Sequence, residues 1–341
     1  MVSEIAKRPL GKTNLMITTL GFGGAAVGNL YSVVDPADAL AALNAAWTFG
    51  INYYDTAPFY GYGLSERRIG DFLRDKPRER FVLSGKVGRL LKPRLDSVSG
   101  FNPFPGAPPF KPIFDYTYDG VMRSFEDSLQ RLGLNRIDVL YIHDIGVSTH
   151  GPNKQPLLMK ICMESGYKAL AKLRQEQTIG AIGIGVNDWQ VCLEAINQAD
   201  FDCFLLAGRY TLLEQTAVER FLPECERRGV SVIIGGPYNS GILATGAHPE
   251  ARYNYQPAPP DILQKVKNIE NICQRYGVSL AAAALQFPLA HPAVTSVIPG
   301  ARSRAEVEQN MALFHAPIPS DFWAKLKSEG LLHGDAPTPV S

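Results

Sequence analysis

The sequence predicts an α/β protein in which eight parallel strands alternate with helices and close into a (β/α)8 TIM barrel. One pattern repeats along the 341 residues, a short β-rich run followed by an amphipathic helical stretch. Several of the β-rich runs are almost continuously apolar, as in residues 230–234, which is typical of strands covered on both faces. No linker or low-complexity tract divides the chain, so we expect one barrel domain over residues 1–341.

Eight short runs are the candidate barrel strands. In chain order they are residues 18–23, 51–55, 81–86, 139–143, 181–186, 203–206, 230–235 and 294–299.

The stretches between these runs show the apolar spacing of three and four that predicts helices. After Tyr118, one helical face carries Val121, Phe125, Leu129 and Leu132, and Gly133 follows as a C-terminal stop. A later stretch repeats the pattern with Ile262, Val266, Ile269 and Cys273, and ends at Gly277.

Three further segments complete the predicted architecture. Residues 9–17 have a turn-rich centre between apolar residues, which indicates an N-terminal β-hairpin that closes one end of the barrel. Two Pro/Gly-rich insertions, residues 90–115 and 238–260, follow strands and therefore lie on the C-terminal face, where barrel enzymes carry their chemistry. The first contains Phe101, Phe104 and Phe110, and we expect it to wall the substrate pocket.

A glycine-rich run at residues 21–26 fits a loose GxGxxA dinucleotide fingerprint, but its context does not. A Rossmann loop opens directly into a helix, whose amides then meet the pyrophosphate. Here the next helix is expected only near Pro36, with Asp35 as its N-cap. Close backbone packing at the end of the first strand is the better interpretation.

Bulk properties exclude several classes of protein. The formal net charge of +1 gives no general reason to expect nucleic acid or an anionic membrane as a partner. No apolar run is long enough to span a bilayer, and the first nine residues lack the apolar core of a signal peptide, so we expect a cytoplasmic protein. The five cysteines form no CxxC pair, which favours reduced structural thiols over a metal or redox site.

Four polar residues lie at or just beyond the C-terminal ends of three consecutive predicted strands. Asp55, Lys86 and His143 each end a strand, and Tyr60 follows Asp55 in the next loop. Neighbouring strand ends converge on one pocket of a closed barrel, so we expect these side chains to meet.

The chemistry of this set is proton exchange with a carbonyl or hydroxyl oxygen. A tyrosine such as Tyr60 has an ordinary pKa of about 10 and needs a cation to stabilise its phenolate, a charge that Lys86 can supply. Asp55 can act as the counter-ion of Lys86, and His143 can hydrogen-bond the substrate oxygen. These groups supply no electrons, so a hydride carrier must also bind.

Residues 55–61, Ser65-Glu66, residues 86–88 and residues 141–144 together resemble the aldo-keto reductases. The likeness extends from Pro9 to about Asn310 and implies a nicotinamide-dependent oxidoreductase. Asp55, Tyr60, Lys86 and His143 match one by one the Asp, Tyr, Lys, His tetrad of that family, so the resemblance implies that they are catalytic, with Tyr60 as the acid/base.

The resemblance also implies where the nicotinamide binds. Asn187 stands in the turn that usually holds the nicotinamide amide, although Val186 replaces the usual serine, and Ala207 stands where many members have a glutamine. Gly235 lies near the usual position of an aromatic ring beneath the nicotinamide, so this part of the site is rebuilt. The expected contacts on this side are Asn187, Tyr210, Gly235, Pro237 and Gly241.

The segment after the last predicted strand resembles the adenosine site of the family. Its expected contacts are Gly300, Arg302, Ser303, Glu306 and Asn310. Gly300 and Glu306 occupy the places where NADP-specific members carry cations for the 2′-phosphate. A carboxylate there repels the phosphate and accepts a hydrogen bond from a free ribose hydroxyl, so we expect NAD to be preferred, with NADP possible.

The runs 205–215 and 235–241 resemble bacterial sugar dehydrogenases of the family that oxidise D-threo-aldoses, L-fucose among them, at the anomeric carbon. An enzyme that oxidises pyridoxal is similar to the same group. Both substrates exist as cyclic hemiacetals, so the resemblance implies oxidation of a hemiacetal to a lactone.

Three other functions fit the sequence less well. A glycosidase with Asp55 and Asp144 as paired carboxylates is disfavoured because Lys86 would neutralise one of them. A metal hydrolase built on His143, Asp144 and His150 lacks HxH or HExxH spacing. A nicotinamide-sensing partner subunit would keep the cofactor and lose turnover, which the complete tetrad argues against. The sequence leaves the oligomeric state open.

Overall fold

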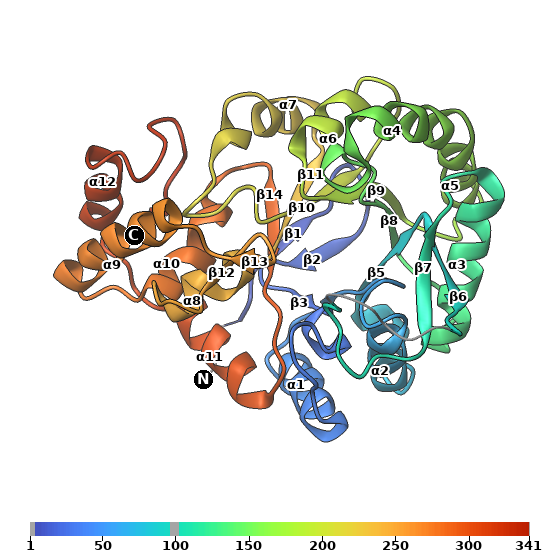
Figure 1. Ribbon diagram of the computed structural model, residues 1–341, viewed down its shortest axis with the longest axis horizontal. Helices are drawn as coiled ribbons and strands as arrows, with labels where there is room; N and C mark the ends of the chain where they lie inside the picture. The colour runs from blue at the N-terminus through green and yellow to red at the C-terminus, as the bar shows by residue number, and fades with distance from the viewer. Residues whose placement is uncertain (1–3, 96–101, 341) are drawn as a thin grey trace.

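The computed structural model describes residues 4–95 and 102–340, and Figure 1 shows its strands enclosed by helices. Eight strands hydrogen-bond in the order β3-β4-β5-β8-β9-β10-β11-β14, and all of these pairings are parallel. They are β3 (Phe22–Gly23), β4 (Tyr53–Asp55), β5 (Val82–Val87), β8 (Val139–His143), β9 (Ala181–Val186), β10 (Cys203–Ala207), β11 (Ser231–Gly235) and β14 (Val294–Ile298). The predicted (β/α)8 barrel is therefore confirmed.

Parallel bridges pair Leu20 with Val297 and Gly23 with Gly300, and so bring the first and last strands together. A Cβ on Gly23 would lie 2.7 Å from the carbonyl oxygen of Ile298. Glycine is therefore required for this close approach, which accounts for the glycine-rich run at residues 21–26 without a dinucleotide loop. The next helix starts at Pro36, and Asp35 caps it by accepting a hydrogen bond from the amide of Ala37 at 2.8 Å.

Helices surround the strands in Figure 1 and cover their outer faces with one large apolar cluster. In chain order they are α1 (Pro36–Thr48), α2 (Leu64–Leu73), α3 (Tyr118–Leu132), α4 (Val147–Ile161), α5 (Tyr167–Gln175), α6 (Trp189–Ala195), α7 (Phe221–Arg228), α8 (Ile242–Thr245), α9 (Pro260–Tyr276), α10 (Leu280–Gln286), α11 (Arg304–Phe314) and α12 (Ser320–Ser328). As predicted, α3 and α9 end at Gly133 and Gly277, both with positive φ. Among the described residues, none of the helices combines the length and apolar character needed to cross a membrane.

The predicted N-terminal hairpin closes one end of the barrel, with β1 (Lys7–Pro9) antiparallel to β2 (Met16–Thr18). Leu10 and Ile17 from this hairpin join the apolar cluster that fills the barrel interior. The strand predicted at residues 18–23 is divided in two, because Thr18 pairs with Lys7 in the hairpin and only β3 continues into the barrel. With this end closed, the opposite end of the barrel is left for chemistry.

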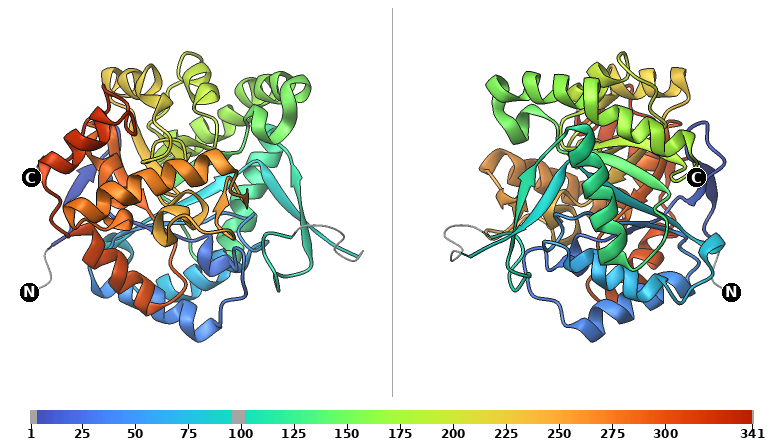
Figure 2. Two further views of the ribbon diagram at one scale, coloured as in Figure 1. Left: turned by 60° about the vertical axis from the view of Figure 1, so that its left-hand side comes forward. Right: turned by 90° about the vertical axis from the view of Figure 1, so that its right-hand side faces the viewer.

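Both insertions fold into ordered elements on the C-terminal face. The first forms the antiparallel hairpin β6 (Arg89–Pro93) and β7 (Phe110–Phe114), which Figure 2 shows standing out from the barrel beside α3. This insertion carries the three phenylalanines of the segment expected to wall the substrate pocket, and one of them, Phe101, lies outside the described residues. The second contains α8 and the short hairpin β12 (Arg252–Tyr253) and β13 (Gln256–Pro257).

Candidate active site

The four predicted polar residues come from three neighbouring strands, since β4, β5 and β8 are adjacent in the sheet. Asp55, Lys86 and His143 lie at their C-terminal ends. Tyr60 lies in the turn between β4 and α2, which packs against the loop after β3. The approach is so close that a Cβ on Gly61, which has φ +62°, would lie 2.3 Å from the carbonyl oxygen of Gly28.

Lys86 and Asp55 form a buried ion pair at the base of the site. The Lys86 Nζ lies 2.7 and 2.6 Å from the two Asp55 carboxylate oxygens and donates to the carbonyl of Thr56 at 3.1 Å. Ser84 adds a hydrogen bond to Asp55 at 2.7 Å. Burial raises the pKa of Asp55 and lowers the pKa of Lys86, and the ion pair opposes both shifts. Each group therefore depends on the other to remain charged.

Tyr60 lies between this pair and His143. The Lys86 Nζ is 4.6 Å from the centre of the Tyr60 ring, and the rings of Tyr60 and His143 are 5.9 Å apart in an edge-to-face arrangement. Burial raises the pKa of Tyr60 well above its ordinary value, and the nearby charge of Asp55 adds to this shift. Burial dominates this shift, so the charge of Lys86, which is paired with Asp55, does not bring the pKa of Tyr60 down to its ordinary value. The phenol holds its proton at neutral pH.

His143 is neutral in this site. Burial lowers the pKa of His143 well below its ordinary value, and the positive charges of Arg89 and Lys86 act in the same direction. Its Nδ1 is buried without a hydrogen-bond partner among the described residues, and its Nε2 lies 3.5 Å from an Asp144 carboxylate oxygen. A neutral imidazole has one donor and one acceptor nitrogen, so His143 is able to hydrogen-bond a substrate oxygen.

Two charged residues beside the tetrad, Arg89 and Asp144, were not assigned a role in the oxidoreductase from the sequence. Arg89, the first residue of β6, forms an ion pair with Asp144, which directly follows His143. Asp144 has φ 51°, a left-handed conformation that aspartate tolerates better than most residues. The sequence marks these two residues only weakly. Asp144 is a charge one position after His143, and Arg89 is a charge three positions after Lys86.

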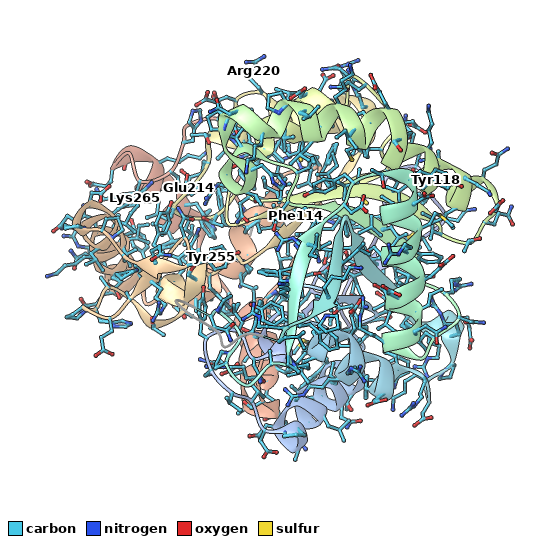
Figure 3. All side chains as sticks on the ribbon, turned by 45° about the vertical axis from the view of Figure 1, so that its right-hand side comes forward. Phe114, Tyr118, Glu214, Arg220, Tyr255 and Lys265 are labelled. Atoms are coloured by element: carbon cyan, nitrogen blue, oxygen red, sulfur yellow. The ribbon has the colours of Figure 1, made fainter. Side chains whose placement is uncertain are left out.

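The second insertion brings Tyr255 to the site. Asn254 and Tyr255 form the two-residue turn of the β12–β13 hairpin, both with positive φ as in a type I′ turn. Asn254 accepts a hydrogen bond from Arg209 at 2.7 Å, which anchors the turn. The Tyr255 ring is partly exposed, but its hydroxyl lies in a buried region that raises its pKa to about 12, with Asn187 opposing this shift. Figure 3 shows Tyr255 on this insertion and Phe114 on the first one.

The expected nicotinamide contacts are only partly gathered. Asn187 donates to the Ala207 carbonyl at 2.9 Å at the ends of β9 and β10, and Gly235 ends the next strand, β11. Pro237 and Gly241 follow in the loop that leads to α8. Tyr210 is fully buried and packs against Phe287 with ring centres 5.2 Å apart, so its ring belongs to the core.

The expected adenosine contacts gather at the start of α11. Ser303 caps this helix by accepting from the Glu306 amide at 3.3 Å. Arg302 holds the Glu306 carboxylate through its backbone amide at 2.8 Å and its guanidinium at 2.8 and 3.1 Å. Asn310 accepts from the Tyr238 hydroxyl at 2.7 Å, and Gly300 pairs with Gly23. The Glu306 charge is thus already balanced by Arg302, which weakens the repulsion expected from the sequence.

Other chemistries have little support in the described ranges. Within residues 4–95 and 102–340, no group of three or more His, Cys, Asp or Glu side chains is placed to hold a metal ion. All five cysteines are free and buried. Asp55, one of the two carboxylates that a glycosidase would need, is bound on both oxygens by Lys86.

A barrel with Asp, Tyr, Lys and His at these strand ends defines a class of oxidoreductase, and the comparisons agree. Residues 19–329 match the Aldo/keto reductase family, and the chain belongs to it. Members of this family use nicotinamide cofactors.

Among its relatives, the chain is 46% identical to pyridoxal 4-dehydrogenase of Microbacterium luteolum, over 96% of this chain and 98% of that protein. It is 40% identical to D-threo-aldose 1-dehydrogenase of a Pseudomonas species, over 95% and 96% of the two chains. The solved holo form of the aldo-keto reductase AKR11C1 from Bacillus halodurans is similar with a TM-score of 0.74 and 26% identity, over 99% of this chain and 98% of that one.

Proposed function

We propose that this aldo-keto reductase is an NAD(P)-dependent aldose 1-dehydrogenase. It would oxidise the cyclic hemiacetal of L-fucose or another D-threo-aldose at C1 to the lactone. The observation that carries this proposal is the position of Tyr60 between the buried Lys86–Asp55 pair and His143. The 40% identical D-threo-aldose 1-dehydrogenase supports the substrate class.

In this reaction the deprotonated form of Tyr60, whose population grows as pH rises, accepts the proton of the anomeric hydroxyl as the C1–H bond breaks. The hydride needs a nicotinamide as its acceptor, which no side chain of the site can replace. Lys86 stabilises the negative charge of the Tyr60 phenolate that accepts the proton, and Asp55 keeps Lys86 charged. Neutral His143 donates to or accepts from the substrate oxygen and holds it beside Tyr60.

A second candidate is oxidation of pyridoxal, and the 46% identity to pyridoxal 4-dehydrogenase favours it. Pyridoxal also forms a cyclic hemiacetal, so the same proton and hydride movements apply. The two candidates differ only in what surrounds the reacting carbon.

A substrate panel tests the proposed function. The purified protein is assayed with L-fucose, other D-threo-aldoses, epimeric aldoses, pyridoxal and simple aldehydes, with each nicotinamide and in both directions. We expect the highest kcat/KM for a D-threo-aldose, with a lactone as product. Turnover of pyridoxal alone would favour the second candidate, and cofactor fluorescence quenching without turnover of any substrate would indicate a nicotinamide-sensing subunit.

We also propose that NAD is preferred over NADP, because Glu306 occupies the place expected to face the ribose and binds Arg302. A 2′-phosphate would have to displace the carboxylate from the guanidinium, whereas a free ribose hydroxyl can donate to Glu306.

Glu306→Arg is expected to shift the ratio of kcat/KM for NAD to that for NADP by about 10- to 100-fold towards NADP, the usual effect of a hydrogen bond to a charged group. The matched control is Glu308→Arg, which breaks the equivalent Glu308–Arg304 pair at 2.7 Å on the same helix. A wild type that favours NADP, or an equal shift in both variants, would show that Glu306 does not set the choice.

A further inference from the structure

Arg89 and Asp144 form an ion pair next to the tetrad that the proposed proton transfer does not use. The Arg89 Nη2 pairs with the Asp144 Oδ2, and the same oxygen lies 3.5 Å from His143 Nε2. The side chains of Arg89 and Asp144 are 6% and 18% exposed. The carboxylate is thus the more accessible partner and remains able to accept hydrogen bonds from a ligand.

Aromatic rings fix the position of the guanidinium. The Arg89 Cζ lies 4.1 Å from the centre of the Phe59 ring and 4.7 Å from the centre of the Phe114 ring. Phe59 precedes Tyr60, and Phe114 ends β7, so the first insertion attaches to the site through these rings. Figure 3 labels Phe114 on its strand. The Arg89 Nε is buried with no hydrogen-bond partner among the described residues.

This arrangement is unfavourable if its only role is packing. Removing two charges from water costs more than their attraction returns unless the remaining hydrogen-bonding groups are also satisfied. Here a guanidinium nitrogen has no partner, so the pair is incompletely satisfied within the described residues. An incompletely satisfied buried pair indicates a role beyond packing. The Asp144 carboxylate, which is 18% exposed, is the part of the pair that a ligand can reach.

We propose that Arg89 and Asp144 bind hydroxyl groups of a polyhydroxylated, uncharged substrate, with the exposed part of the Phe59 ring covering its C–H face. This inference rests on the proposed function and names the part of the site that selects aldoses. A carboxylate accepts a hydrogen bond from one hydroxyl group, and a guanidinium donates a hydrogen bond to the next hydroxyl group, so the pair suits two adjacent hydroxyls of a substrate. Because the two charges cancel, the pair gives no general attraction for an anionic substrate such as a sugar phosphate.

The position of the pair fits this role. Asp144 raises the pKa of Tyr60 and Arg89 opposes that shift, so both charges act at the phenol. A substrate whose anomeric hydroxyl reaches Tyr60 and His143 would therefore place its other ring hydroxyls near the pair. A simple aldehyde has no such hydroxyls and would leave the pair unused.

The test uses Asp144→Asn and Arg89→Lys in the full chain with its nicotinamide, and the favoured aldose as probe. Asparagine keeps the shape of the side chain without its charge, and lysine keeps the charge without the planar fork. For the aldose we expect KM to rise about 10- to 100-fold in Asp144→Asn, with a small change in kcat, as for loss of uniform binding. For a simple aldehyde assayed in reduction, which has no hydroxyls for the pair to bind, KM is expected to change much less than for the aldose.

Singly deoxygenated analogues of the aldose make the test specific. The penalty of Asp144→Asn should disappear for the analogue that lacks the contacted hydroxyl and persist for the others, as in a double-mutant cycle. Nicotinamide affinity, measured by fluorescence quenching, should not change. The double variant Arg89→Met with Asp144→Asn removes both charges and is expected to fold even if a single variant does not.

Arg174→Lys is the matched control. Arg174 pairs with Asp202 at 2.7 Å, and Asp202 directly precedes β10, so this ion pair lies at the opposite end of the barrel from the tetrad. It should leave the kinetics unchanged. Suppose that the wild type oxidises aldoses. If Asp144→Asn then keeps the wild-type KM, or loses activity equally on every substrate, the inference is overturned and the proposed function stays intact. A wild type that oxidises no aldose would overturn both.

Discussion

Tyr60→Phe is expected to lower kcat by about 10²- to 10⁴-fold, the usual contribution of a positioned acid/base. The substitution removes one oxygen atom and leaves the ring, which packs edge-to-face on His143 at 5.9 Å. Stability and nicotinamide affinity should therefore stay close to those of the wild type. Steady-state kinetics and fluorescence quenching measure the two quantities separately.

The matched control is Tyr62→Phe, two residues further along the same turn. The Tyr62 hydroxyl donates to Asn102 at 3.3 Å, outside the tetrad, so its removal should have little effect on kcat. Near-normal turnover in Tyr60→Phe, or equal losses in the two variants, would exclude Tyr60 as the acid/base.

The pH dependence of the wild type follows from the same residue. Burial raises the pKa of Tyr60, so the phenol carries its proton at neutral pH and loses it only at high pH. Reduction uses Tyr60 as a proton donor and should be independent of pH in the neutral range. Oxidation uses it as a proton acceptor and should become faster as pH rises towards that pKa.

The barrel could be predicted from the sequence because each strand carries its own local signal. Strands covered on both faces are apolar throughout, so β9 is recognisable as a run of buried residues without reference to the rest of the chain. The tetrad could be predicted equally well, because residues at the C-terminal ends of neighbouring barrel strands face the same pocket. Local pattern plus topology was sufficient for both.

The remaining parts of the site depend on contacts that no local pattern encodes. Asp144 lies beside the tetrad with its backbone in a left-handed conformation, and Arg89 lies there at the start of β6, which folds back with β7. Tyr255 reaches it through a hairpin turn near the end of the second insertion. Conversely, Tyr210 was expected near the nicotinamide, yet its ring packs on Phe287, because burial of a large aromatic surface stabilises the core.

Lys86→Met is expected to lower kcat by about 10²- to 10³-fold, the usual cost of removing one preorganised electrostatic group. It should also move the alkaline rise of the oxidation rate to higher pH, because the negative charge of Asp55, which raises the pKa of Tyr60, would no longer be balanced. Asp55→Asn has two opposing effects: it removes that negative charge, but the buried lysine then loses its proton more readily. Its shift in the pH profile should be smaller.

Stability measurements separate this catalytic effect from a structural one. Lys86→Met leaves the Asp55 carboxylate buried without its partner, which typically costs about 3–5 kcal/mol in the free energy of unfolding. The double variant Lys86→Met with Asp55→Asn has no unpaired charge, so most of that loss should be recovered in chemical denaturation while kcat remains low. If the double variant recovered turnover together with stability, or if Lys86→Met kept the wild-type pH profile and activity, Lys86 would have only a structural role.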